Sequence, residues 1–195
     1  MGSMMKEVPC THWLQNGRKD PASLDLRSDT ITIPTASMLN AIQPCTLGDD
    51  VFGEDDSTNQ LETCVAKRIG KEAGLSVLSG TMGNQLALRS LLTQLPHSVL
   101  CDCRSQIFVH EAGGTSSLSG AQFQPVVPKN GKYLTLEGVH DHVVLGQDIH
   151  SCPTRDISLE NTIHGLIIRL KEIERICLFA REHGIKMHLD GARLW

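Results

Sequence analysis

Apolar residues recur along this chain at two different spacings, and the spacings separate expected helices from expected strands. From Ser57 onward, segments with an apolar residue at every third or fourth position alternate with short continuous apolar runs. The first spacing places apolar side chains on one face of a helix, whereas a short continuous run is typical of a strand buried on both faces. The alternation therefore predicts an α/β fold, in which helices cover a parallel-rich sheet.

Capping and breaking residues give these elements approximate bounds. A sequence that resembles a capping box opens the first helix, Pro96 stops the second, and Gly184 ends the last. The expected helices are residues 57–74, 80–95, a short segment from 135, and 170–184. The expected strands are Val99–Cys101, Phe123–Val127, Ile157–Leu159 and Ile185–Leu189. No repeat or linker marks a domain boundary.

Composition narrows the class of protein. With 195 residues, 40% hydrophobic and 21% charged, the chain fits one soluble globular domain. A net charge of −4 offers no basic surface for nucleic acid or an anionic membrane, so the expected partner is a small molecule or a protein. Seven cysteines, an odd number, indicate reduced thiols, and no leader or apolar span is evident, so we expect a cytoplasmic protein. Residues 1–23 are expected to be an N-terminal extension to a domain that covers 24–195.

Two segments have residue types that suit a bound anionic cofactor and an amino acid. In Ser79–Asn84, glycine lets backbone N–H groups approach an anion at the start of a helix, although an ordinary capped turn fits equally well. Asp190 follows the last strand, where a carboxylate can pair with a cationic ring nitrogen and Arg193 can grip a carboxylate, although a structural Asp–Arg pair is the alternative. Ligands of open α/β sheets bind outside the carboxyl ends of the strands, so the Gly80 turn and Asp190 are expected to converge.

Other polar patterns are weaker. The segment from Asp25 to Thr35 has the composition of a capped loop, and the acidic run 48–55 lacks the ligand spacing of a calcium loop. Cys101, Cys103 and His110 lack a fourth ligand for zinc, so we expect no metal.

Seven separated motifs resemble, in order, those of the low-specificity threonine aldolases. The similarity covers about residues 24–195. The motifs are Leu26–Thr30, Gly48–Gly53, Ser79–Thr81, Glu111–Gly114, Asp148–His150, Ser158–Asn161 and His188–Arg193.

This resemblance implies a fold and a chemistry. Members of the family have the fold type I architecture of enzymes that use pyridoxal 5'-phosphate (PLP), and they split threonine or allo-threonine into glycine and acetaldehyde. By resemblance, Gly80 and Thr81 bind the cofactor phosphate, and Asp190 pairs with the ring nitrogen. Ser28 and Arg193 hold the substrate carboxylate, and Arg193 also counts among the cofactor-binding residues. His150 lies near the substrate hydroxyl as a base or a water-positioning group.

The chain also departs from the family pattern. Gln106 stands where the family has a histidine that stacks on the cofactor ring, and glutamine cannot titrate near neutral pH. The lysine that forms the Schiff base with the cofactor is expected beyond Trp195, as are the rest of the large domain and the small C-terminal domain. Lys129, Lys132, Lys171 and Lys186 are expected to be solvated surface lysines.

Three functions are consistent with the sequence. The complete protein is expected to be a threonine aldolase-like lyase and a homo-oligomer, with the chain as printed inactive alone. An amino-acid racemase of the same family is a rival, because a carbanion can be reprotonated on either face. A third reading is a non-catalytic fragment that associates with a full-length partner, whether the truncation is natural or an error in the gene sequence.

Overall fold

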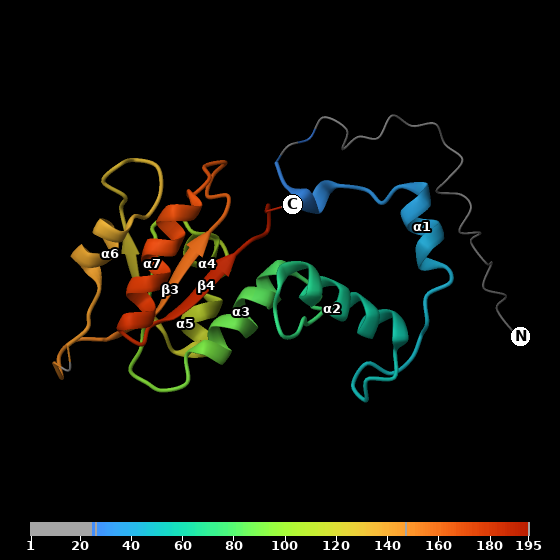
Figure 1. The fold of residues 1–195 in the computed structure, drawn as a ribbon, viewed down its shortest axis with the longest axis horizontal. Helices are drawn as coiled ribbons and strands as arrows, with labels where there is room; N and C mark the ends of the chain where they lie inside the picture. Colours follow the sequence, from blue (N-terminus) through green and yellow to red (C-terminus); the bar gives the residue numbers. More distant parts are fainter. Residues whose placement is uncertain (1–24, 26, 147, 195) are drawn as a thin grey trace, which may run out of the picture. The chain divides into compact units, whose positions relative to one another are not determined.

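The computed structural model describes residue 25 and residues 27–146 and 148–194 (Figure 1). Contacts within the chain divide it into two compact units, with the boundary between Ser76 and Val77. The boundary falls in a segment whose composition marks no linker. The expected extension, residues 1–23, lies outside the described residues.

The first unit is built from short helices that polar side chains cap. It contains the 3-10 helix η2 (Asp29–Ile31) and the α-helices α1 (Ala36–Ile42) and α2 (Asp56–Ile69). The Ser28 side chain accepts the N–H of Thr30 at the start of η2, and that of Thr35 accepts the N–H of Met38 at the start of α1. Residues 25–35 therefore have the local conformation of the capped loop that their composition predicts.

The predicted bounds of α2 were wrong at both ends. The N-cap is Asp55, whose side chain accepts the N–H of Ser57, so residues 57–60 lie inside the helix rather than forming its capping box. The helix ends at Gly70, which takes the left-handed conformation with φ of 66°, and not at Gly74. Glycine adopts that conformation without a Cβ penalty, and this stops the helix one turn earlier than the apolar spacing suggests.

The second unit is the α/β domain that the apolar pattern predicts. A four-stranded sheet has the order β2-β1-β3-β4, and each pair of neighbours is parallel. Its strands are β1 (Ser98–Asp102), β2 (Gln122–Val126), β3 (Thr154–Glu160) and β4 (Lys186–Asp190). Its helices are α3 (Gly80–Leu91), α4 (Gln106–Val109), α5 (Gly114–Ser119), α6 (Leu136–His142) and α7 (Leu170–Glu182). The fold class, with all four strands, is confirmed.

Local sequence features explain where the predicted helices differ from the observed ones. Helix α3 ends at Leu91 rather than at residue 95, because Leu92 leaves the helical conformation and Leu95 precedes a proline, a position that disfavours helix. Helices α4 and α5 were not predicted, since they have four and six residues and are too short to show a periodic apolar face. The four lysines expected on the surface are exposed.

Alternate residues of β1 and β2 contribute to two apolar layers, one on each face of the sheet, whereas the core apolar residues of β3 and β4 pack only in the layer under α6 and α7. Leu100 of β1 packs with Ile157 of β3 and Ile176 of α7 in the layer under α6 and α7. Val99 of β1 packs with Leu88 of α3 in the layer under α3, α4 and α5. In Figure 1 the strands lie between these helices. The sheet is therefore covered on both faces and fixes the positions of its strand ends.

One carboxyl group is buried inside this core. Asp156 of β3 is 0% exposed and is the register partner of Val99, so it faces the α3 side of the sheet. Both of its carboxyl oxygens are buried and have no hydrogen-bond partner. Burial raises the pKa of Asp156 to about 8.

This buried carboxyl makes stability depend on pH. Between the ordinary pKa of 3.8 and the raised pKa of about 8, the folded protein holds one proton more than the unfolded chain. The free energy of unfolding therefore falls by about 1.4 kcal/mol per pH unit in that window and levels off above it. Asp156→Asn should remove this slope, which urea unfolding between pH 5 and 9 would measure. Asp141→Asn, at an exposed carboxylate paired with Lys129, is the matched control and should keep the slope. Parallel stability curves for Asp156→Asn and the wild type would contradict the assignment.

Candidate active site

Three strands of the sheet end in an acidic residue. Asp102, Glu160 and Asp190 are the last residues of β1, β3 and β4. Because these strands are parallel, their carboxyl ends lie at one edge of the sheet, where open α/β sheets bind their ligands. We call these three residues the carboxylate edge. Each has its own hydrogen-bond donor, and the donors differ.

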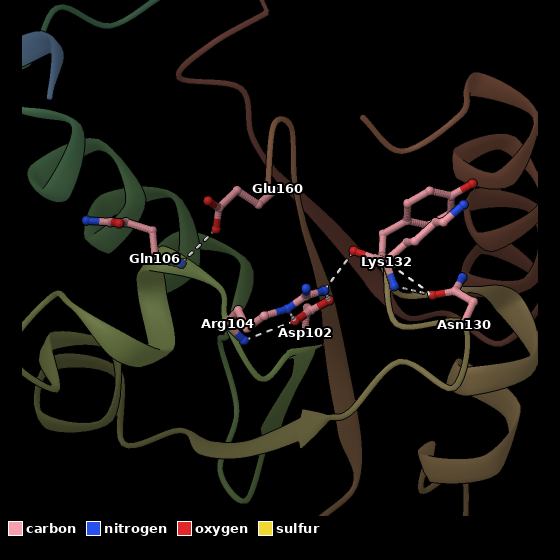
Figure 2. Close-up of polar contacts among 7 residues, drawn as sticks. Asp102, Arg104, Gln106, Asn130, Lys132 and Glu160 are labelled. Atoms are coloured by element: carbon pink, nitrogen blue, oxygen red, sulfur yellow. Dashed lines mark hydrogen bonds and ion pairs between the residues drawn. The ribbon is translucent and has the colours of Figure 1, made fainter. Parts of the chain in front are cut away.

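Asp102 is bound by an arginine two residues away. Arg104 donates its backbone N–H and Nε to one carboxylate oxygen at 3.0 and 2.9 Å, and its Nη2 to the other at 2.8 Å. The same Nη2 donates to the carbonyl of Lys132 at 2.7 Å, and Asn130 holds that loop by accepting the Lys132 N–H (Figure 2). Asp102 is thus occupied by a structural ion pair.

Glu160 holds the start of α4. Its Oε2 accepts the backbone N–H of Gln106 at 2.7 Å, while the Gln106 side chain is exposed and its amide points away from Glu160 in Figure 2. Burial raises the pKa of Glu160, and the negative charges of Asp190 and Asp102 add to the increase. Glu160 therefore fixes the backbone of Gln106, while the Gln106 side chain stays exposed at the carboxylate edge.

Asp190 is bound by an asparagine from α3. Asn84 donates from Nδ2 to Asp190 Oδ2 at 2.9 Å and to Glu111 Oε1 at 2.8 Å. Gln85 donates to the second oxygen of Glu111 at 2.5 Å, and the backbone N–H of Ala192 donates to Asp190 Oδ1 at 3.1 Å. Burial raises the pKa of Glu111, and the charge of Asp190 adds a smaller increase. Each oxygen of the two carboxyl groups thus receives an N–H donor.

Backbone conformation explains how Glu111 reaches this cluster. Ala112 has φ of 53° and Gly113 has φ of 69°, so two consecutive residues are left-handed immediately after Glu111. That conformation is rare for alanine and costs roughly 1 kcal/mol. A Cβ at Gly114 would lie 2.8 Å from the side chain of Gln85, so glycine is required for Gln85 to lie across this turn. The sequence Glu-Ala-Gly-Gly therefore serves to bring Glu111 and Gln85 together.

A buried histidine lies on the same strand face as Asp190. His188 Nδ1 is 2.8 Å from Ser158 Oγ, and burial lowers the pKa of His188. Its partner is the neighbouring residue of β3, because Ser158 and His188 are in register. This neutral pair fills the space behind the carboxylate edge without adding charge.

Helix α3 carries both the glycine turn and Asn84. Its N-cap Ser79 accepts the N–H of Met82 at 3.1 Å, and a Cβ on Gly80 would have no atom within 4 Å. Asn84 follows Gly80 by four residues and contacts Asp190, so the first turns of α3 lie beside the carboxyl end of β4. Gly80 and Thr81 are exposed there.

The other predicted site residues occupy different surroundings. His150 is exposed in the loop before β3, where its N–H donates to Asp148 at 2.9 Å. Arg193 is exposed in the turn after β4. Ser28 lies in the first unit, where it caps η2. The second unit thus brings Asp190 to the helix that begins at Gly80, while Ser28 and His150 have local hydrogen bonds of their own.

Sequence reasoning missed Asn84 and Gln85 and gave Glu111 no role. Asn84 and Glu111 lie in segments that were singled out from the sequence, and Gln85 lies in the expected helix 80–95, but their contacts join residues 26, 27 and 106 positions apart. The unusual signal was Glu-Ala-Gly-Gly, because two glycines in succession mark special backbone conformations.

The segments considered for metals have structural explanations. Asp49 of the acidic run accepts the N–H groups of Val51 and Phe52 and forms a turn. Cys101 is buried in the core, and burial raises the pKa of its thiol to about 12. Within residues 25, 27–146 and 148–194, no group of three or more His, Cys, Asp or Glu side chains is arranged to hold a metal ion. Among the same residues, no helix is long and apolar enough to cross a membrane.

Comparison with known proteins gives a consistent result. Residues 25–195 match the beta-eliminating lyase family. The low-specificity L-threonine aldolase of Saccharomyces cerevisiae is 53% identical over 89% of this chain and 45% of its own length. The alanine racemase TOXG of Cochliobolus carbonum is 46% identical over 92% of this chain and 46% of its own length. The chain thus spans about half the length of these curated relatives.

Solved structures agree with the fold. A putative L-allo-threonine aldolase from Listeria monocytogenes aligns with a TM-score of 0.63 and 27% identity, over 80% of this chain and 43% of that one. A structure of SPT with PLP aligns with a TM-score of 0.54 and 18% identity, over 74% of this chain and 33% of that one, and this supports the fold alone. The second unit therefore has the fold of the type I PLP enzymes.

The contact between Gly114 and Gln85 can be tested by coupled substitutions. Gly114→Ala should lower the free energy of unfolding by about 1–2 kcal/mol, because the new methyl group displaces the Gln85 amide from Glu111. In a Gln85→Ala background the same change should be neutral or stabilising, since alanine favours a helix more than glycine does. Urea unfolding of the four proteins measures the coupling. Equal costs in the two backgrounds would show that Gln85 is not the reason for the glycine.

Proposed function

The chain belongs to the beta-eliminating lyase family, and on that basis we propose that the complete protein is a PLP-dependent enzyme that cleaves threonine or allo-threonine to glycine and acetaldehyde. The single observation that supports this most strongly is the Asp190 carboxylate, held at the ligand-binding edge of the sheet by one donor on each oxygen. The names of the relatives, several of which are low-specificity threonine aldolases, support the substrate.

The residues of α3 and β4 fit this cofactor. Each oxygen of Asp190 accepts a hydrogen bond and keeps acceptor capacity for a protonated ring nitrogen. The N-terminus of α3 has open space at Gly80, so the N–H groups of Gly80 and Thr81 can approach a phosphate, which the helix dipole also favours. When bound, PLP supplies an electron sink for the negative charge that develops on the substrate.

The chain's own residues would then divide the remaining work. Asp190 would keep the ring nitrogen protonated, and Gln106 would cover the ring from the start of α4. Arg193 and Ser28 would bind the substrate carboxylate, because a guanidinium offers two parallel donors to it. His150 would accept the proton of the substrate hydroxyl as the carbon–carbon bond breaks, or position a water that does so.

An amino-acid racemase is the second candidate. The observation that favours it is Gln106, which stands where the aldolase pattern has a histidine and cannot exchange a proton near neutral pH. A relative with 46% identity is named an alanine racemase, which supports the same reading.

We further propose that the complete protein is a cytoplasmic homo-oligomer. Helix α2 carries Leu61, Val65 and Ile69 at a spacing of four, and they are 55%, 43% and 44% exposed. A stripe of this kind is typical of a helix face that packs on another surface. The same stripe would serve the alternative in which this chain is a non-catalytic fragment bound to a full-length partner.

Product analysis separates the candidates. The complete protein to which these residues belong, loaded with PLP, should release acetaldehyde from L-threonine or L-allo-threonine and form no D-alanine from L-alanine. D-Alanine without acetaldehyde would replace the aldolase proposal with the racemase. The chain as printed should show neither reaction above free PLP, and turnover by it would contradict the expectation that it is inactive alone.

A further inference from the structure

One side-chain amide joins two carboxyl groups at the candidate site. The two N–H bonds of Asn84 point to different acceptors, Glu111 Oε1 at 2.8 Å and Asp190 Oδ2 at 2.9 Å. An amide NH2 has only two hydrogens, so both are used. We infer that Asn84 is a positioning residue that orients Asp190 toward the ring nitrogen of the cofactor, an inference that rests on the proposed PLP function.

The geometry restricts Asp190 in a specific way. Its Oδ2 accepts from Asn84 on α3, and its Oδ1 accepts from the backbone N–H of Ala192 in the following turn. Donors on both oxygens fix the rotation of the carboxylate plane. If Asn84 were replaced by an apolar residue, the turn would still hold Oδ1, but the plane could rotate about the Cβ–Cγ bond.

Glu111 and Gln85 in turn fix Asn84. These three side chains form one hydrogen-bonded network, and Asn84, Gln85 and Glu111 are only 9%, 8% and 7% exposed. The network is therefore almost entirely shielded from solvent. Gln85 occupies the second oxygen of Glu111, which leaves Oε1 for Asn84. A buried amide with two acceptors loses both bonds if it rotates, so Glu111 and Asp190 fix the orientation of the Asn84 amide, although the buried Oε1 of Gln85 has no hydrogen-bond partner.

Asn84 also lies between two groups that repel each other. Burial and the charge of Asp190 both raise the pKa of Glu111, whereas the hydrogen bond from Asn84 lowers it. The amide thus offsets repulsion between the carboxyl groups by donating to each. Removing the donor should move the pKa of Glu111 further upward.

Cofactor analogues distinguish positioning from general support. The complete apoprotein would be titrated with PLP and with its deaza analogue, in which C–H replaces the ring nitrogen. If Asn84 acts through Asp190, Asn84→Ala should weaken PLP binding about tenfold or more and leave binding of the deaza analogue within about twofold. Asn59→Ala removes an exposed hydrogen bond from the Asn59 side-chain amide to the Gly53 carbonyl. It is the matched control and should change the binding of neither ligand.

Equal weakening of both ligands by Asn84→Ala would overturn the inference, because it would indicate a merely structural role. If Asn84→Ala does not fold, Asn84→Ser keeps one donor and should give the same selective loss at a smaller size. If Asn84→Ser does not weaken PLP binding more than binding of the deaza analogue, the inference is also overturned.

A measurement without cofactor separates this inference from the proposed function. Carbon NMR of the carboxyl groups in the apoprotein should show the Glu111 titration moving to higher pH in Asn84→Ala. An unmoved Glu111 titration would refute the network itself, even if PLP binds. A moved titration in a protein that binds neither ligand would refute the PLP proposal and, with it, the positioning role.

Discussion

The second unit depends on one constraint, which is that parallel strands bring their carboxyl ends to the same edge. Here β1, β3 and β4 each end in an acidic residue, so three carboxyl groups meet within one small region. Such a group of like charges is unfavourable unless each has a donor. The structure meets this requirement with three different donors, namely the Arg104 guanidinium for Asp102, the Gln106 backbone for Glu160, and the Asn84 amide for Asp190.

Only the last of these arrangements suits a bound cofactor. Arg104 forms an ion pair with Asp102, and Glu160 holds the start of α4, whereas Asp190 is half-buried and accepts hydrogen bonds from the uncharged Asn84 amide and the Ala192 backbone. The helix that supplies Asn84 begins at Gly80, so a single helix connects the turn proposed to bind the cofactor phosphate with the carboxylate proposed to pair with its ring.

The sequence was sufficient for the sheet and insufficient for the network. Buried strands and the amphipathic α7 have strong local patterns, so they were predicted within a few residues. Helix α2 was placed with the wrong ends, because left-handed Gly70 overrides the apolar spacing that continues to Ala73. Helices α4 and α5 depend on tertiary contacts and on the left-handed residues Ala112 and Gly113. The spacing of apolar residues along the chain carries no information about either. The bond between Asn84 and Asp190 spans 106 positions, and no local pattern contains it.

Asp190 is proposed to carry the charge that keeps the cofactor ring protonated. The most direct measurement is nitrogen NMR of PLP labelled at the ring nitrogen and bound to the complete protein. We expect a protonated ring nitrogen at neutral pH in the wild type, and an unprotonated one in Asp190→Asn, whose neutral amide cannot stabilise the cation. An unprotonated ring nitrogen in the wild type, or a protonated one in Asp190→Asn, would contradict the account.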